Sequence, residues 1–406
     1  MTGMHASPRK SRRFALPTHP QANDVADAVT VVSHTGSLLV AGTMDGRVVA
    51  WDTDSGQLVC SIPQYSEKET MVTWLFGIGI PGFERCFAGK ADGTVSEYDL
   101  RSGQLVSTCG YYESRVRCLT YDVRARKMWV GTGAGRLAEV DVRRHNPGRV
   151  GRYLEKFPQQ EIGAMCFHKG RLYIAVGCTI VCRPNSARST YPFRHAAIID
   201  AMCIAMGDEN FLCSAARDGS ICVWRFSGQG VICVASAFAR SPGATREVSL
   251  LRMNLTWDES RGRLYSLRHD GIVNEWKIDL ISKEDRNVAL LCTSTYMTRQ
   301  GHGEHTRFSP LLPPPPICSA DGSLFTKGTG CIVELERFNR QPSDWSGKEP
   351  INDVLNAQIR VDGAVLDAQV RVSLDDDKTH DKTPVRVSLE DDGEHQYVLI
   401  SAGIKN

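Results

Sequence analysis

A short sequence pattern recurs along this 406-residue chain with constant internal spacing. The first copy is AGTMDGRVVAWD at residues 41–52, and three more read AGKADGTVSEYD (88–99), SAARDGSICVWR (214–225) and SLRHDGIVNEWK (266–277). In each copy an Asp-Gly pair follows small or apolar residues, and an aromatic residue stands six positions after the Asp. Asp-Gly between apolar runs favours a β-hairpin, because glycine accepts positive φ and aspartate can bond its own backbone.

Three weaker copies keep this register at residues 130–141, 172–183 and 325–336, where Val140, Cys182 and Leu335 replace the aromatic ring. One turn glycine persists in all copies: Gly46, Gly93, Gly135, Gly177, Gly219, Gly271 and Gly330. The four complete copies add an aspartate and a ring each, for which we predict structural roles in turns and packing: Asp45, Trp51, Asp92, Tyr98, Asp218, Trp224, Asp270 and Trp276. A unit of roughly 40 to 45 residues with about four short strands is typical of a propeller blade.

The pattern DG-x4-[WY]-[DRK] resembles the WD-repeat (WD40) β-propeller family over about residues 28 to 338. The segments AWDTDSGQL and EYDLRSGQL resemble the end of the third strand of a repeat and the turn into the fourth. The resemblance implies an all-β, seven-bladed propeller. The Gly-His dipeptide that usually opens such a repeat is missing from the expected positions, so we expect the family's Asp–His–Ser/Thr–Trp hydrogen-bond network to be incomplete.

We expect three regions: a disordered basic arm (1–27), a seven-bladed propeller (28–340) and an acidic C-terminal extension (341–406). The blades are predicted near residues 28–62, 71–109, 115–150, 161–190, 198–236, 247–295 and 306–338. The extension contains 13 acidic and 7 basic residues and the near-duplicates VRVSLDDD (370–377) and VRVSLEDD (385–392), whose alternation predicts strands. Either an extension strand or the N-terminal arm must supply the last strand of blade seven, since an open ring leaves unpaired edges.

Composition favours a soluble intracellular protein. The formal charge is +2, and no apolar run reaches the roughly 18 residues that cross a bilayer. The chain has 14 cysteines, most of them in apolar runs and none in a Cys-x2-Cys pair, so we expect reduced core thiols. We expect a cytoplasmic or nuclear location. Organellar import stays open because the arm carries Arg and Ser and lacks acids before Asp24.

Several segments permit a binding role but are most simply solvent-exposed. The arm (SPRKSRR) permits nuclear import or nucleic-acid binding, and Pro313–Pro316 permits docking of a proline-reading domain. The acidic runs at 375–377 and 390–392 lack the oxygen spacing of a calcium loop, and His302 and His305 stand alone. Phosphate-binding loops and hydrolase motifs are missing. We therefore predict no enzymatic activity, no metal and no cofactor.

Two strand ends are candidate partner-binding sites. Tyr98-Asp99-Leu100-Arg101 and Val140-Asp141-Val142-Arg143 resemble the box by which many WD-repeat proteins bind the adaptor of a cullin-RING ubiquitin ligase. A guanidinium at such a turn can bind a partner carboxylate through two hydrogen bonds. Our first hypothesis is a non-catalytic protein-interaction scaffold within a larger complex. The alternatives are a ubiquitin-ligase substrate receptor and a ribonucleoprotein or RNA-processing component, the latter indicated by the basic arm and by Arg143, Arg144, Arg149 and Arg152.

Overall fold

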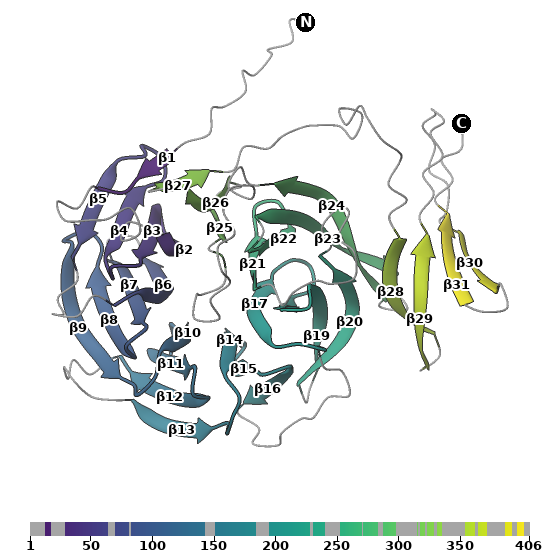
Figure 1. The fold of residues 1–406 in the computed structure, drawn as a ribbon, viewed down its shortest axis with the longest axis horizontal. Helices are drawn as coiled ribbons and strands as arrows, with labels where there is room; N and C mark the ends of the chain where they lie inside the picture. Colours follow the sequence, from purple (N-terminus) through teal and green to yellow (C-terminus); the bar gives the residue numbers. More distant parts are fainter. Residues whose placement is uncertain are drawn as a thin grey trace, which may run out of the picture.

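Seven antiparallel sheets stand around a common centre in the computed structural model, each with one edge at the centre and one at the rim (Figure 1). The structure describes residues 13–17, 29–63, 70–80, 83–142, 151–183, 195–227, 230–239, 252–269, 271–282, 287–297, 315, 317–320, 323–328 and 331–334, and the backbone of four strands between residues 354 and 401. Strands that follow one another in sequence pair within a sheet, as the predicted hairpins require. The prediction of an all-β propeller is confirmed.

Four short strands, numbered from the centre outwards, form most blades. Blade one consists of β2 (Val29–Thr35), β3 (Leu38–Thr43), β4 (Val48–Asp52) and β5 (Leu58–Ile62), blade two of β6 (Val72–Ile80), β7 (Phe83–Lys90), β8 (Thr94–Asp99) and β9 (Gln104–Tyr111), and blade three of β10 (Val116–Asp122), β11 (Lys127–Thr132), β12 (Arg136–Asp141) and β13 (Arg152–Lys156). In the described residues, blade four has three strands: β14 (Ile162–His168), β15 (Arg171–Val176) and β16 (Thr179–Arg183).

The remaining blades follow the same order. Blade five consists of β17 (Ile199–Ala205), β18 (Phe211–Ala216), β19 (Ser220–Ser227) and β20 (Gly230–Phe238), blade six of β21 (Met253–Asp258), β22 (Arg263–Arg268), β23 (Ile272–Ser282) and β24 (Asn287–Met297), and blade seven of β25 (Ile317–Ala320), β26 (Ser323–Gly328), β27 (Cys331–Glu334) and β1 (Arg13–Ala15). The innermost strands β2, β6, β10, β14, β17, β21 and β25 contact one another in this order, and β25 contacts β2. The ring is therefore closed.

The closing strand comes from the N-terminal arm. Strand β1 pairs antiparallel with β27, with Arg13 opposite Val333 and Ala15 opposite Cys331. Leu16 is buried beside it in one apolar cluster with Trp51 of blade one and Phe325 of blade seven. The prediction of a wholly disordered arm over residues 1–27 is therefore wrong for residues 13–15, because this segment satisfies the open edge of β27 and joins the two ends of the ring.

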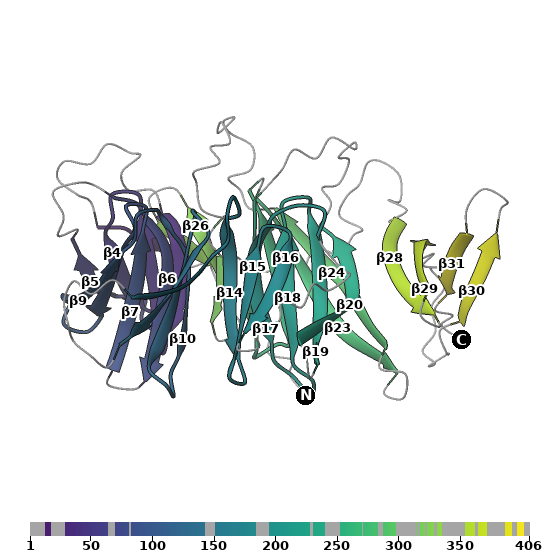
Figure 2. The same ribbon diagram turned by 90° about the horizontal axis from the view of Figure 1, so that it is seen from below.

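The acidic extension forms a sheet of its own. Its strands β28 (Val354–Val361), β29 (Ala364–Arg371), β31 (Gln396–Ser401) and β30 (Arg386–Asp391) lie in this order, with β29 and β31 parallel. The sheet stands beside the ring rather than in it, and β28 contacts β20 of blade five (Figure 2). The extension thus does not supply the strand that closes blade seven. No helix in the described residues has the length and apolar character to span a bilayer.

The repeated glycines lie at the hairpin corners between the second and third strands. Backbone φ is positive at all those described, Gly46, Gly93, Gly135, Gly177, Gly219 and Gly271, whereas Gly330 and Asp270 lie outside the described residues. At Gly93, with φ 90°, a Cβ atom would stand 1.6 Å from the carbonyl oxygen of Tyr112. Only glycine fits this corner. The neighbouring Asp92 accepts a hydrogen bond from the Thr94 N–H at 2.8 Å, which fixes the turn.

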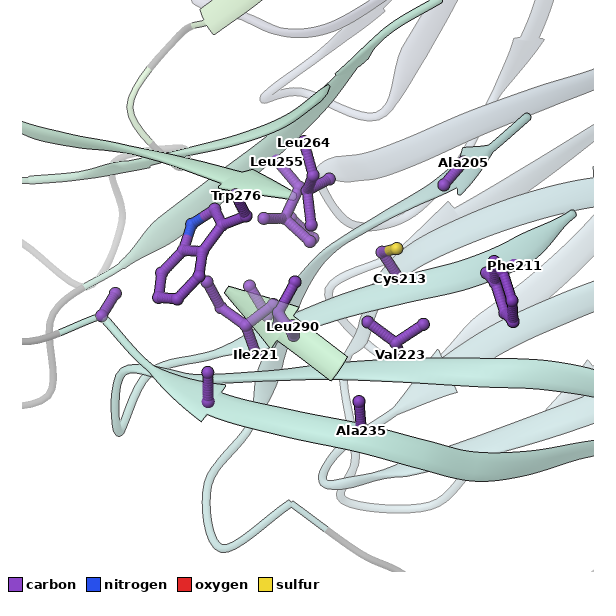
Figure 3. Packing of buried hydrophobic residues seen from close by; sticks show 14 of the residues in the cluster. Ala205, Phe211, Cys213, Ile221, Val223, Ala235, Leu255, Leu264, Trp276 and Leu290 are labelled. Atoms are coloured by element: carbon purple, nitrogen blue, oxygen red, sulfur yellow. The ribbon is translucent and has the colours of Figure 1, made fainter. Parts of the chain in front are cut away.

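The repeated aromatic rings hold neighbouring blades together. Trp51, Tyr98, Trp224 and Trp276 are 1–2% exposed. Trp276 of blade six packs in one cluster with Ile221, Val223 and other blade-five residues (Figure 3). Tyr98 likewise packs with residues of blade one, and Trp51 with residues of blade seven. Each ring therefore buries its apolar surface between its own blade and the preceding one, where broad side chains contribute most.

Candidate functional site

The turn after β8 carries two of the predicted partner-binding residues. The Oδ1 atom of Asp99 accepts hydrogen bonds from the N–H groups of Arg101 (3.0 Å) and Ser102 (2.9 Å). These bonds, chiefly that from Ser102, lower the pKa of Asp99. Asp52 caps the equivalent turn of blade one in the same way, with the Ser55 N–H at 2.7 Å. Asp99 therefore stabilises its own turn.

Arg101 projects from this turn, and its side chain is 63% exposed. Its Nε and Nη2 atoms both donate to the carboxylate of Glu84 on β7, the second bond at 2.9 Å. This fork-to-fork pairing raises the pKa of Arg101 and fixes the guanidinium beside β7 of blade two. The rest of the side chain is exposed to solvent.

The second box is only partly described. Asp141 ends β12 opposite Lys127 of β11, whereas Arg143 lies outside the described residues. Arg144 and Arg149 also lie outside them, and Arg152 is exposed at the start of β13. The structure thus describes one of the two boxes in full, and both ligase-adaptor binding and RNA binding stay predictions.

Blade five contains a continuous hydrogen-bond chain that joins three of its segments. Trp224 Nε1 donates to Ser214 Oγ at 2.7 Å, and Ser214 Oγ lies 2.7 Å from His195 Nε2. His195 Nδ1 lies 2.6 Å from Ser220 Oγ, which donates to Asp218 at 2.6 Å. Each serine hydroxyl has one proton and can donate only once. All donors therefore point from the indole towards the carboxylate, and His195 carries its proton on Nδ1. Burial lowers the pKa of His195 to about 4.

The expectation of an incomplete network is therefore wrong for blade five. In the sequence His195 follows an arginine rather than a glycine, so it does not form the Gly-His dipeptide on which that expectation was based. In blade six the described residues show the tryptophan end of such a network, where Trp276 Nε1 donates to Ser266 Oγ at 2.9 Å. The hydrogen-bond chain of blade five fixes the loop before β17 to the strands of that blade. It is buried rather than presented to a partner.

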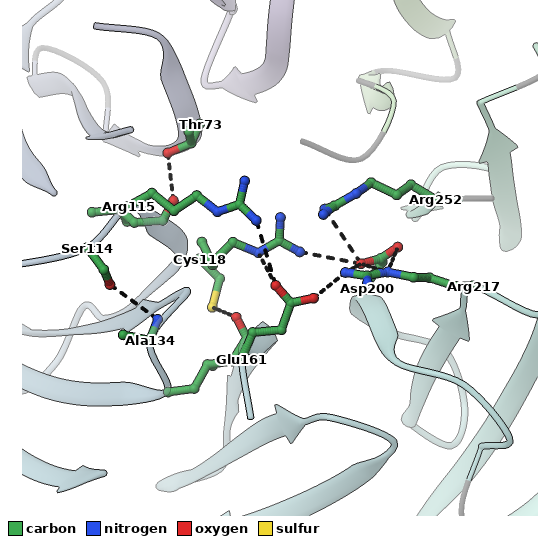
Figure 4. A network of polar contacts seen from close by, with 12 residues as sticks. Thr73, Ser114, Arg115, Cys118, Ala134, Glu161, Asp200, Arg217 and Arg252 are labelled. Atoms are coloured by element: carbon green, nitrogen blue, oxygen red, sulfur yellow. Dashed lines mark hydrogen bonds and ion pairs between the residues drawn. The ribbon is translucent and has the colours of Figure 1, made fainter. Parts of the chain in front are cut away.

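A second polar site, which sequence reasoning missed, spans blades three to six. We call it the arginine cluster; it consists of Arg115, Arg117, Glu161, Asp200, Arg217 and Arg252 (Figure 4). Most members stand at or just before the start of an inner strand, and Arg217 follows β18. Asp200 is fully buried, and the side chains of Arg117 and Arg252 are 4% and 6% exposed.

Arg217 makes the strong contacts of the cluster. Its Nε atom lies 3.1 Å from both Asp200 oxygens, and its Nη2 donates to Asp200 at 3.0 Å and also to Glu161. These two carboxylates raise the pKa of Arg217, although burial works against them. Burial works against Glu161 as well, but the guanidinium groups of Arg117, Arg217 and Arg252 together hold its pKa below the usual range.

The chain is a β-propeller by the order and closure of its sheets. The family model described as WD domain, G-beta repeat matches residues 11–52 and 190–225, the first of which runs from β1 to β4. These two matches show WD repeats in blade one and blade five of the propeller.

Solved structures share this fold at low sequence identity. A chain of the mitotic checkpoint complex is 16% identical with a TM-score of 0.57, and covers 84% of this chain and 98% of its own. The WD40 repeats of RRP9 are 15% identical with a TM-score of 0.58 (80% and 99% covered). The Cps50 (Swd1) propeller of Myceliophteria thermophila is 14% identical with a TM-score of 0.57 (82% and 99% covered). No curated protein matches the sequence.

The structure groups no three potential metal-ligating side chains among the residues it describes. His302, His305 and the side chains of the acidic runs 375–377 and 390–392 lie outside those residues. The thiols of the described part are free, and burial raises the pKa of Cys86 to about 12. Such a thiol packs as an apolar group.

Proposed function

We propose that this chain is a non-catalytic scaffold that binds other proteins through the rim of its ring. The observation that supports this proposal is the location of its exposed apolar side chains. Most large exposed ones lie on the outermost strands of the blades: Leu58, Val59, Tyr111, Tyr153, Ile232, Phe238 and Leu291. Apolar side chains exposed on a rigid surface, tyrosine above all, are typical centres of protein interfaces.

Charged substitutions on the rim test this proposal. We expect Leu58→Asp and Tyr111→Asp each to reduce recovery of co-purifying proteins about tenfold, because a charge at an interface centre stays desolvated and unpaired. Val123→Asp is the matched control: Val123 is 56% exposed but lies in the turn after β10. Recovery by quantitative mass spectrometry that is unchanged in both rim variants, with unchanged melting temperatures, would refute the rim as the binding surface.

A second candidate function is that of a substrate receptor for a cullin-RING ubiquitin ligase. It rests on the box at residues 98–101, where Asp99 orders the turn and Arg101 stands out from it. We expect Arg101→Ala to abolish recovery of a ligase adaptor while recovery of rim-bound partners persists. Arg101→Lys should restore little binding, because an ammonium group cannot reproduce the planar fork. Adaptor recovery that is independent of Arg101 argues against this function.

A further inference from the structure

Blade five carries a cysteine on each of its four strands: Cys203 on β17, Cys213 on β18, Cys222 on β19 and Cys233 on β20. All four thiols are free. The antiparallel register places Cys203 directly opposite Cys213 on the neighbouring strand. The two thiols are also in hydrogen-bonding contact with each other. The fold therefore brings together two thiols that no Cys-x2-Cys motif marks in the sequence.

The backbone positions of this pair fit a disulfide. Residues that stand directly opposite each other in antiparallel strands have Cα atoms about 4.5–5.5 Å apart. A disulfide requires Cα atoms about 4.4–6.8 Å apart, so the register of Cys203 and Cys213 lies within this range. Both residues lie in the interior of their strands, so paired backbone on each side maintains the spacing. A bond between the two sulfurs therefore requires little movement of the sheet.

Cys222 and Cys233 offer a matched comparison in the same blade. Their thiols are in contact as well. However, Cys222 stands opposite Ser236 and Cys233 stands opposite Trp224, so the two cysteines are diagonal rather than direct neighbours. Diagonal neighbours are typically about 7–8 Å apart, which exceeds the disulfide range. Contact between thiols is thus common to both pairs, whereas the backbone spacing of a disulfide belongs to Cys203 and Cys213.

The thiols of Cys203 and Cys213 differ in their access to solvent. Cys213 is fully buried in the apolar cluster between blades five and six (Figure 3). Cys203 packs against the same cluster but is only half-buried. A small reagent therefore reaches Cys203 first, and Cys213 lies behind it to complete a reaction. The contact with Cys213, together with burial, raises the pKa of Cys203, so its thiolate is scarce at neutral pH and reacts slowly there.

We propose that Cys203 and Cys213 form a reversible redox site that undergoes thiol–disulfide exchange with small-molecule disulfides. In the first step the Cys203 thiolate attacks one sulfur of the small disulfide, which forms a mixed disulfide and releases one small thiolate. In the second step the Cys213 thiolate attacks Cys203 Sγ and releases the other small thiolate. The protein loses two electrons and the two protons of its thiols, and the small disulfide becomes two thiols. Excess small thiol reverses both steps.

Disulfide mapping of the folded full chain tests the proposal. The protein is brought to equilibrium with oxidised glutathione at pH 8, the remaining thiols are alkylated, and the chain is cleaved without reduction. Trypsin leaves both cysteines in one peptide, so the digest needs an enzyme that cleaves after Glu209, which lies between them. We expect linked peptides that join Cys203 to Cys213, and their separation after addition of excess reduced glutathione. Absence of this bridge at equilibrium, or a bridge that reduced glutathione does not open, overturns the proposal.

Serine variants test the order of the two steps. Cys213→Ser should stop at the mixed disulfide and carry one glutathione on Cys203, whereas Cys203→Ser should carry none on Cys213, because that thiol is buried. Cys222→Ser is the matched control and should form the bridge as the wild type does. Burial, followed by the charge of Cys203, raises the pKa of Cys166 in blade four, so Cys166 is a competing thiol. A bridge from Cys203 to Cys166, or from Cys222 to Cys233, in place of the proposed pair would contradict the assignment.

The melting temperature shows whether the bridge fits the folded sheet. A disulfide that fits the native register restricts the unfolded chain and should raise the melting temperature of the oxidised wild type by about 2–5 °C. Oxidised Cys222→Ser should show the same rise, and Cys213→Ser should show none. A lower melting temperature of the bridged wild type would show that the bond distorts the sheet and would overturn the proposal.

Discussion

Blades one to five carry the same β-bulge at the start of their inner strands. The side chain at this bulge differs between blades one and two and blades three to five. In each of these blades one residue bulges out of the register between the first and second strands: Thr30, Thr73, Arg117, Gly163 and Asp200. Blades one and two use threonine, blades three and five use a charged residue, and blade four uses glycine. One backbone position therefore serves three kinds of inter-blade contact.

In the threonine blades the contact is local and complete. Thr30 Oγ1 lies 2.6 Å from the carbonyl oxygen of Val72 in the next blade, and Thr73 Oγ1 lies 2.6 Å from that of Val116. Each hydroxyl is also near a carbonyl of its own blade, Gly42 at 3.1 Å and Gly89 at 3.0 Å. A neutral donor thus joins two blades without needing help from a third.

In the charged blades, Asp200 and Glu161 each form ion pairs with residues of more than one other blade. Asp200 of blade five contacts Arg117 of blade three and Arg252 of blade six, and Glu161 of blade four contacts Arg117 and Arg217. The charges therefore couple four blades, whereas each threonine couples two. We expect acid to destabilise the blades with charged inner residues, and we expect no such response in the blades with threonine.

The largest effect should come from Asp200→Asn. Removing this buried charge leaves four arginines with Glu161 alone, and breaking a buried ion pair typically costs about 3–5 kcal/mol. Urea unfolding measures the loss. Asp122→Asn is the control, because Asp122 caps an exposed turn through its Oδ1, which the amide retains, and should cost less than about 1 kcal/mol. Equal losses in the two variants would remove the distinction between the halves.

Acid should destabilise blade five before blades one and two. His195 has its pKa lowered to about 4 from 6.5, so the unfolded chain takes up a proton that the folded chain does not between these values. Stability therefore falls as pH drops from 6.5 to 4, by about 2–3 kcal/mol at pH 4.5. Hydrogen exchange at pH 7 and 4.5 locates the loss. His195→Gln should lack this dependence, and a loss of protection that is uniform around the ring would contradict the prediction.

Gly163→Ala should cost up to about 3 kcal/mol, because overpacking against backbone cannot relax easily. A Cβ at Gly163 would stand 1.9 Å from the carbonyl oxygen of Ile199, at the position where Val72 and Val116 accept from threonine. Gly207→Ala is the control, since its Cβ would meet the nearest atom at 3.8 Å. Similar unfolding midpoints for both variants would show that blade four is not packed this closely.

The smallest effects should come from Thr30→Val and Thr73→Val. Each removes one hydroxyl donor at constant shape and should cost about 1 kcal/mol, measured by urea unfolding at pH 7. The double variant should lose the sum, because the two hydroxyls have no shared partner. The serine variants should retain most of the stability. A double-variant loss far above the sum would mean that the threonine half is coupled like the charged half.

The fold could be predicted from the chain because its signals are local and repeated. Gly93 requires a positive φ, and Trp276 lies a fixed number of residues after the turn, so hairpin and ring follow from short sequence windows. The closing strand could only be narrowed to two candidates, because pairing of residues 13–15 with 331–333 depends on both ends meeting in space. His195 was missed because an arginine precedes it, where the family's usual Gly-His dipeptide has a glycine.

The repeated hairpin, its aromatic side chains and the closure of the ring follow from the amino-acid sequence, since each unit exposes apolar faces that only neighbouring units can cover. The roles of the inner positions depend on which blades meet at the centre. Aligned repeats place Thr30, Thr73, Arg117, Gly163 and Asp200 at one position, but nothing local tells which neighbour each meets. The arginine cluster exists because four blades bring charges together at the centre, and the balance of those charges depends on distances that the chain order does not contain.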